Sequence, residues 1–213
     1  MRIDIWSDVV CPFCYLGKRH LELALERARP GADTEIVWHS FELDPTIERV
    51  ASASLVEKIS AKYGISLTQS QQAQEDIATR AHEVGLEFNW REARFGNTFD
   101  AHRLIHLAAS EGLADRAHER LMRAYFTEAV AIGDLAELQR LGEEIGLSPD
   151  SVAGLLSGET FAAEVRADEE LARSLGINAV PFFVFNQKYG VSGAQPVDTF
   201  VQVLEQVAAA PPD

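Results

Sequence analysis

Two cysteines three positions apart are the residues of this chain whose spacing most clearly suggests chemistry. Cys11 and Cys14 enclose Pro12 and Phe13 and are the only cysteines among 213 residues. They follow an apolar, alternating segment, so Cys11 is predicted to leave a strand and open a helix. Free backbone N–H groups and the helix dipole favour a thiolate there. A thiol one helical turn later can then attack a mixed disulfide formed at the first.

Two other interpretations of the cysteines are inert burial and metal binding. A tetrahedral zinc site needs two further ligands, and the chain has no third cysteine. His102 and His106 have the i, i+4 spacing of helical metal ligands. Arg103 nevertheless stands where the metalloprotease motif requires glutamate, and no third ligand is suggested nearby. We therefore predict a redox dithiol and no metal site.

The composition is that of an acidic globular protein. Nineteen basic and 33 acidic residues give a net charge of −14, and 46% of the residues are hydrophobic. A charge of this sign argues against nucleic acid or an anionic membrane as partner. No apolar run has the length of a transmembrane helix, and charged residues interrupt the first positions where a secretory signal would be apolar. We expect a cytoplasmic protein, in which a dithiol is more often catalytic than structural.

The chain opens with a β-α-β pattern. Ile3 and Ile5 alternate with polar residues in the first strand, and a helix is expected from the cysteine pair to about Ala28. Pro12 suits the first helical position because its missing N–H has no helical partner, which makes Cys11 the cap residue. Residues 34–41 are rich in β-branched and aromatic types and predict the second strand.

The last part of the chain predicts a β-β-α pattern. Residues 181–185 form an apolar run, a turn falls at 186–187, and a second short strand follows near 189–191. The final helix starts after Pro196. The long segment between the two patterns is predicted to be helical, with capping boxes at Thr68 and Asp134 and a cap at Ser148. The predicted fold class is α/β: one domain from residues 1–44 and 177–213, interrupted by an all-helical insertion of residues 45–176.

These elements and two motifs resemble a known family. The motifs are residues 7–18, SDVVCPFCYLGK, and residues 97–104, NTFDAHRL. Together with the late Val180-Pro181 pair they resemble the thioredoxin-like DsbA family, and in particular its FrnE-like subgroup, over essentially the whole chain. The subgroup more often has tryptophan at the position of Phe13. Kappa-class glutathione transferases and 2-hydroxychromene-2-carboxylate isomerases are related to this family.

The resemblance implies a thiol-disulfide oxidoreductase in which Cys11 attacks and Cys14 resolves. The redox group would be a Cys11–Cys14 disulfide, with no bound cofactor and with glutathione as a possible co-substrate. Pro181 would be a cis-proline facing the pair, and the backbone of Val180 would pair with the substrate. Taken alone, Pro181 would be interpreted as a proline that starts a strand; with the cysteine pair present, we expect the cis form.

Further candidate substrate contacts lie beside the cysteines and in the second motif. Pro12 and Phe13 separate the two thiols, and packing inside the protein is an equal alternative for Phe13. His102 is a candidate for contacting substrate because it belongs to the second resembling motif. Asp8 is expected to be solvated, with proton relay as the alternative.

Three functions remain open from the sequence. The first oxidises, reduces or isomerises disulfides of a protein or small-molecule substrate. The second is a glutathione-dependent isomerase or transferase on the same scaffold, in which relatives commonly have serine in place of Cys11. Ala194 and Gln195 also replace the Ser-Asp-like pair that contacts glutathione in those relatives. The third is a non-enzymatic redox sensor or binding protein, and the sequence does not predict an oligomeric state.

Overall fold

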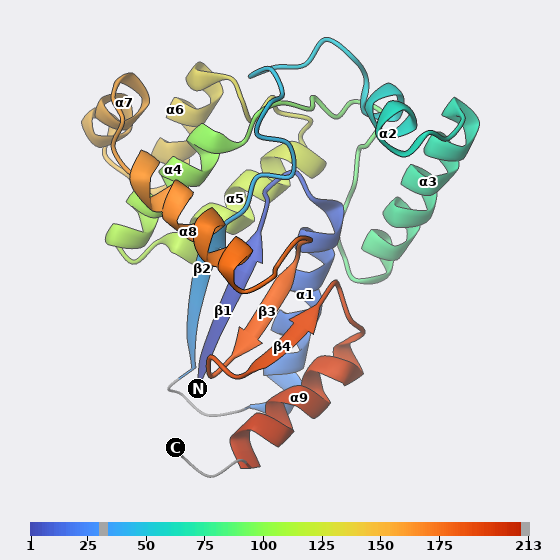
Figure 1. Cartoon of the computed structure of the whole chain (residues 1–213). Helices are drawn as coiled ribbons and strands as arrows, with labels where there is room; N and C mark the ends of the chain where they lie inside the picture. Colours follow the sequence, from blue (N-terminus) through green and yellow to red (C-terminus); the bar gives the residue numbers. More distant parts are fainter. Residues whose placement is uncertain (30–33, 210–213) are drawn as a thin grey trace. The chain divides into compact units, whose positions relative to one another are not determined.

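The chain builds one α/β unit, leaves it for a helical unit, and then returns to the first (Figure 1). The computed structural model describes residues 1–29 and 34–209. The dithiol unit comprises Met1–Leu43 and Asp168–Asp213, and the helical unit comprises Asp44–Ala167. The sequence places the second boundary at residue 176, whereas the helical unit ends inside a helix that spans Ala162–Ser174.

The dithiol unit contains the strands and helices predicted for the two ends of the chain. Its elements are β1 (Arg2–Ser7), α1 (Pro12–Ala28), β2 (Glu35–Ser40), β3 (Phe182–Phe185), β4 (Tyr189–Ser192) and α9 (Val197–Ala209), together with the second half of α8 (Ala162–Ser174). The sheet order is β2-β1-β3-β4. Strands β1 and β2 are parallel, and the other two pairings are antiparallel. β1 is therefore an inner strand of the sheet, and α1 begins shortly after the end of that strand.

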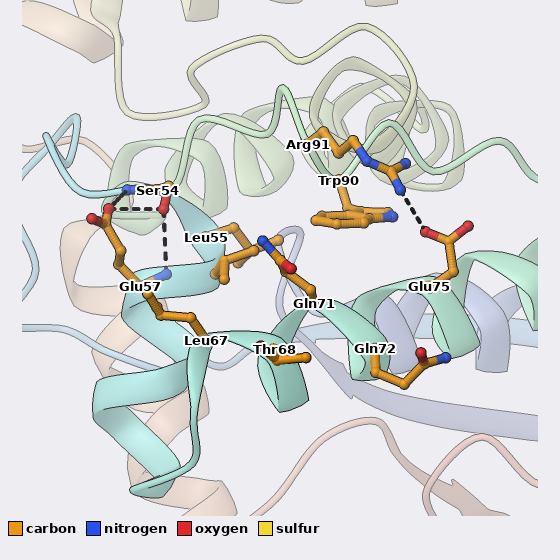
Figure 2. A pocket seen from close by; sticks show the side chains of 11 residues that line it. Ser54, Leu55, Glu57, Leu67, Thr68, Gln71, Gln72, Glu75, Trp90 and Arg91 are labelled. Atoms are coloured by element: carbon orange, nitrogen blue, oxygen red, sulfur yellow. Dashed lines mark hydrogen bonds and ion pairs between the residues drawn. The ribbon is translucent and has the colours of Figure 1, made fainter.

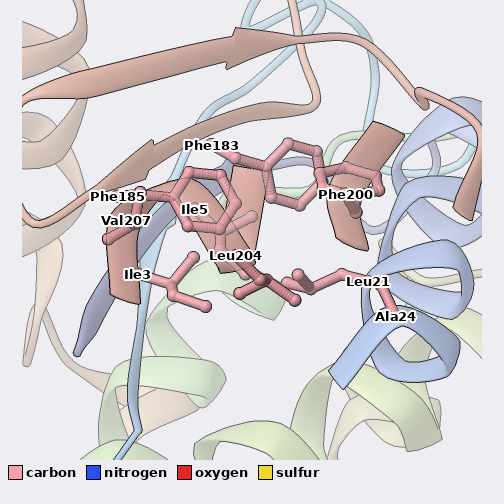
Figure 3. Close-up of a cluster of buried hydrophobic side chains, with 9 residues drawn as sticks. All are labelled: Ile3, Ile5, Leu21, Ala24, Phe183, Phe185, Phe200, Leu204 and Val207. Carbon is pink, nitrogen blue, oxygen red and sulfur yellow. The ribbon is translucent and has the colours of Figure 1, made fainter. Parts of the chain in front are cut away.

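One face of the sheet packs against α1 and α9 (Figure 3). Alternate residues of a strand point to the same face, so Ile3 and Ile5 of β1 meet Phe183 and Phe185 of β3. The Phe200 ring of α9 lies edge-on to Phe183, with 4.8 Å between ring centroids. The remaining buried members of this cluster are Leu21, Ala24, Leu204 and Val207. Burial of each large apolar side chain stabilises the fold by about 1.5–3 kcal/mol.

Residues 186–188 connect β3 to β4, and the Lys188 N–H donates to the Phe185 carbonyl at 3.0 Å across a tight turn. Asn186 and Gln187 both have left-handed backbone conformations, with φ of 47° and 56°. Two successive positive φ values are typical of the type I′ turn, whose twist matches that of the strands it joins. The predicted turn is confirmed.

Gly17 allows α1 to approach β3 closely. A Cβ atom at this position would lie 3.0 Å from Pro181 Cγ and 3.1 Å from Phe183 Cζ. A side chain there would push against both rings, so glycine sets the distance between the helix that begins at the dithiol and the segment that holds Pro181.

Several helices of the helical unit begin at a residue whose side chain caps the helix. Its helices are α2 (Leu55–Tyr63), α3 (Leu67–Glu83), α4 (Phe99–Ser110), α5 (Ala114–Phe126), α6 (Leu135–Ile145), α7 (Pro149–Ser157) and the first half of α8. Asp134 and Ser148 cap α6 and α7 as predicted. The predicted capping box at Thr68 is wrong, because Ser66 and Gln69 form the box two residues earlier. Both positions have the required spacing, and the earlier start lengthens the helix.

Membrane insertion is not supported by any described helix. Among residues 1–29 and 34–209, no helix is both long and apolar enough to cross a bilayer.

Replacing Gly17 by alanine should destabilise the protein. Overpacking against Pro181 and Phe183 costs about 1–3 kcal/mol, which exceeds the gain of up to about 1 kcal/mol in helix propensity. Gly154 in α7 is the matched control, because nothing lies within 4 Å of its Cβ position. Gly154→Ala should therefore raise the unfolding free energy by up to about 1 kcal/mol. Urea unfolding compares the variants, and a Gly17→Ala protein as stable as the wild type would contradict the packing argument.

Candidate active site

The dithiol lies at the start of α1, as the sequence predicts. Cys11 is the N-cap residue, with an extended backbone (φ −85°, ψ 115°), and Pro12 is the first helical residue. The backbone N–H groups of Cys14 and Tyr15 donate to the Cys11 carbonyl at 3.0 and 3.3 Å. The first turn contains no acidic residue, and the Cys11 side chain makes no capping hydrogen bond. The Cys11 sulfur therefore sits at the positive end of the helix without a competing anion in that turn.

The structure brings Cys11, Cys14 and Val180 together. Both cysteines are free thiols, with 3% and 1% of their surfaces exposed, and they lie 3.3 Å apart. The Cys11 thiol donates a weak hydrogen bond to the Val180 carbonyl, with 3.7 Å between sulfur and oxygen. The peptide bond between Val180 and Pro181 is cis. Two segments far apart in the sequence thus meet at one sulfur atom.

The surroundings of Cys14 keep its thiol protonated. Burial raises the pKa of Cys14 well above its ordinary value of 9.0, and the hydrogen bond and electrostatic interaction with Cys11 raise that pKa further. The Asp8 backbone and the Ser7 side chain offset part of this effect on the pKa. A protonated thiol is a poor nucleophile, so Cys14 is unsuited to making the first attack on a disulfide.

Asp8 positions the segment that leads into the dithiol. Its carboxylate accepts the Leu43 N–H at 2.8 Å, and its carbonyl accepts the Cys11 N–H at 3.1 Å. Only 1% of Asp8 is exposed, so the expectation that this residue is solvated is wrong. A buried carboxylate requires partners of this kind, which fix the chain on both sides of it. Proton relay by Asp8 stays a prediction.

The other predicted substrate contacts differ in exposure. Phe13 exposes 39% of its surface, and Pro12 beside it is half-buried. His102 belongs to α4 of the helical unit and exposes 1%. Their contacts with substrate stay predictions. A group of three or more potential metal ligands was not found among the described residues.

The second motif of the sequence has a structural role through Arg103. This buried guanidinium pairs with Asp100 at 2.8 Å. It also donates to the carbonyls of Leu155 and Gly158, both at 2.6 Å, and to that of Thr160 at 2.8 Å. Leu155 lies in the last turn of α7, and Gly158 and Thr160 follow its end, where backbone carbonyls need partners outside the helix. One side chain thereby closes the turn between α7 and α8, which the sequence did not reveal.

The sequence also did not predict a charged cluster beside β1 and β2. The His39 ring lies between two carboxylates, with Nε2 2.9 Å from Asp4 Oδ1 and Nδ1 2.7 Å from Asp168 Oδ1. The Trp6 ring stacks on His39 with 4.3 Å between centroids. The other Asp168 oxygen accepts the Ser40 N–H at 2.8 Å. Asp168 is thus hydrogen-bonded to β2, and it is the first residue of the second segment of the dithiol unit.

The cluster favours a charged imidazole. Burial alone would lower the pKa of His39, but its hydrogen bonds to Asp168 and Asp4 outweigh burial and raise that pKa. Burial would likewise raise the pKa of Asp4, but hydrogen bonds from Arg2 and His39 lower it. Both ring nitrogens then act as donors, as in an imidazolium ion. Asp168 is distant in sequence and belongs to no motif, so nothing local predicts this contact.

The cluster should make stability depend on pH in a defined direction. Because the pKa of His39 is raised, its stabilisation is complete below the ordinary value of 6.5 and is lost as pH rises through the folded-state pKa. Asp4 contributes above its ordinary pKa of 3.8 and loses its contribution as pH falls through its lowered pKa.

His39→Gln should therefore destabilise the protein most between about pH 4 and 6.5, and less at higher pH. Urea unfolding at a series of pH values measures the difference, with the same substitution at the exposed His82 as control. A gap between wild type and His39→Gln that stays constant from pH 5 to 9 would contradict a charged His39.

The site and sheet together define a class of protein. A dithiol at the N-terminus of α1, held against the residue before a proline that precedes β3, on a sheet of order β2-β1-β3-β4, is the arrangement of thioredoxin-like proteins. The family model of the DsbA-like thioredoxin domain matches residues 2–205, and the chain belongs to that family. The predicted fold class, a thioredoxin-like fold with large helical content, is confirmed.

Comparison with individual proteins agrees with this assignment. A probable DsbA oxidoreductase from Streptomyces coelicolor is 38% identical, with a TM-score of 0.95 over 100% of this chain and 92% of that chain. The uncharacterised protein YwbO of Bacillus subtilis is 29% identical over 206 residues, which cover 96% of each chain. The cytosolic disulfide reductase DsbM of Pseudomonas aeruginosa is 18% identical and shares the fold, with a TM-score of 0.66 over 99% of this chain and 100% of that chain. DsbM has also been solved with glutathione.

These findings establish the general activity. The protein is a disulfide oxidoreductase or isomerase of the DsbA family and acts on thiol or disulfide substrates. The redox group of this family is a disulfide within the protein rather than an external cofactor.

Proposed function

We propose that Cys11 is the nucleophile and Cys14 the resolving thiol of this disulfide oxidoreductase. The observation that carries the proposal is the asymmetry between the two sulfurs. Cys11 caps α1 and points to the Val180 carbonyl, whereas the raised pKa of the deeper Cys14 keeps it protonated. Only the first sulfur is therefore placed to begin the exchange.

Reduction of a substrate proceeds in two exchanges. The Cys11 thiolate attacks one sulfur of the substrate disulfide, that S–S bond breaks, and the second substrate sulfur leaves and takes up a proton. Cys11 is then part of a mixed disulfide and no longer carries the charge that raised the pKa of Cys14. Cys14 loses its proton and attacks Cys11, which releases the second substrate thiol. The protein keeps a Cys11–Cys14 disulfide, and oxidation of a substrate follows the same steps in reverse.

The groups around Cys11 supply the substrate contacts in this proposal. Val180 offers its backbone beside Cys11, and Pro181 follows it against α1. Pro12 and the exposed Phe13 lie between the two thiols along the chain. The polypeptide around a substrate cysteine would bind to these backbone and apolar groups.

Glutathione is the proposed electron donor, and the cytoplasm the proposed location. DsbM, which has this fold, is a cytosolic disulfide reductase and has been solved with glutathione. Cys11 stands where the isomerase and transferase relatives commonly have serine. Together with Cys14 it forms a dithiol, which favours redox exchange. Glutathione would reduce the Cys11–Cys14 disulfide by the same two exchanges and would leave as glutathione disulfide.

Insulin reduction tests the assignment of the two cysteines. With glutathione as reductant, the wild type should precipitate the insulin B chain faster than glutathione alone, and Cys11→Ser should fall to that background. Cys14→Ser should lose most turnover because its mixed disulfide can be released only by an external thiol. Full activity of Cys14→Ser with glutathione would instead support the isomerase or transferase function. Equal activity of Cys11→Ser and wild type would refute the nucleophile assignment.

A further inference from the structure

The helical unit contains a cavity that the dithiol chemistry does not use. It has a volume of about 670 Å³ and is lined by the starts of α2 and α3 and by the segment after α3 that holds Trp90 and Arg91 (Figure 2). Cavities of about 300–1,000 Å³ are typical of ligand sites in proteins.

The charged groups of the cavity wall already have partners. Arg91 forms an ion pair with Glu75 at 2.8 Å and also stacks over the Trp90 ring at 4.2 Å. Glu57 accepts hydrogen bonds from the backbone N–H and the hydroxyl of Ser54, both at 2.8 Å. Arg91 is thus paired with Glu75, and Glu57 keeps its negative charge, so these groups disfavour an anionic ligand and are compatible with an uncharged one.

Several neutral polar groups of the wall remain open. Gln72 donates to Asp76 at 2.8 Å, but its neighbour Gln71 and the Thr68 hydroxyl have no hydrogen-bond partner within the described part of the chain. The Trp90 indole N–H likewise has none among those residues. Gln71 and Trp90 both line the cavity, Gln71 from α3 and Trp90 from the segment after it (Figure 2). A carboxamide offers a donor and an acceptor, and an indole offers a donor.

The apolar part of the wall is incompletely covered. Leu67 exposes 52% of its surface, and Leu55 and Val56 of α2 are only half-buried. Helix α2 has no fully buried residue. A ligand that placed an apolar side chain against these residues would remove their surface from water, which stabilises binding.

We propose that this cavity binds an uncharged, extended stretch of polypeptide that carries an apolar side chain, supplied by the protein substrate. The backbone of such a stretch presents neutral N–H and C=O groups that match the Gln71 carboxamide, the Thr68 hydroxyl and the Trp90 N–H. The cavity is also larger than one side chain requires. This inference rests on the proposed function, because it names a protein as the substrate and gives the helical unit a part in binding it.

The test uses the full-length protein and cysteine-free peptides, so that no disulfide chemistry contributes. The probe is a fluorescently labelled, uncharged octapeptide of serine and glycine with leucine at two central positions, and its binding is measured by fluorescence polarisation. The wild type should bind it saturably, and an octapeptide with glycine at both leucine positions should bind at least about fivefold more weakly.

The variants Gln71→Ala and Leu67→Ala should each raise the Kd for the leucine peptide by about fivefold, since each loses one contact. Both residues are exposed, so the variants should fold normally. Tyr63→Ala is the matched control, because Tyr63 is 64% exposed in α2 but does not line the cavity. Its Kd should equal that of the wild type.

Three results would overturn the inference. They are the absence of saturable binding by the wild type, equal binding by Gln71→Ala, Leu67→Ala and wild type, and binding of N-acetylphenylalanine amide in place of the peptide. The insulin assay reports on the proposed function separately. Peptide binding without insulin reduction would refute the dithiol function and leave the binding site, whereas insulin reduction without peptide binding would refute the binding site alone.

Discussion

The chemistry of this protein depends on the burial of one thiol beside another at the start of a helix. Cys14 is 1% exposed, and its pKa is raised first by burial and then by its contact with Cys11. In the proposed mechanism, the electrostatic effect of Cys11 on Cys14 is removed when Cys11 enters a mixed disulfide. In that mechanism, the second thiol is held back until the first has reacted, and the order of the two exchanges follows from electrostatics.

The rest of the dithiol unit keeps this geometry in place. Asp8 ties the segment before Cys11 to Leu43, and the sheet pairs β1 with β3, so that Val180 reaches the Cys11 sulfur. Gly17 lets the same helix lie against Pro181. At the edge of the sheet, the His39 cluster joins Asp168 to β2 and so fixes where the chain re-enters the unit. Each of these contacts joins segments that are separated along the chain.

The sequence predicted those features that depend on neighbouring residues. The strand through Ile3 and Ile5, Pro12 at the start of the helix, and the turn at Asn186 were predicted from local signals, and each was confirmed. The start of α3 shows the limit of such signals, because Ser66 and Thr68 satisfy the same capping pattern and only one can begin the helix.

Contacts between distant residues could not be predicted in this way. The burial of Asp8, the partnership of His39 with Asp168, and the carbonyl groups bound by Arg103 all require the tertiary structure. Asp4 in the first strand was the one available signal, because a charge on a buried strand needs a partner. The resemblance located the second motif but did not reveal that Arg103 closes the end of α7.

Trapping with Cys14→Ala tests the central claim most directly. The variant lacks the resolving thiol, so a substrate attacked by Cys11 should remain attached to it as a mixed disulfide. Mass spectrometry of peptides from non-reduced samples should find a substrate cysteine linked to Cys11, and a Cys11→Ala variant should trap none through Cys14. Recovery of substrate on Cys14 in Cys11→Ala, with none on Cys11 in Cys14→Ala, would contradict the assigned order of attack.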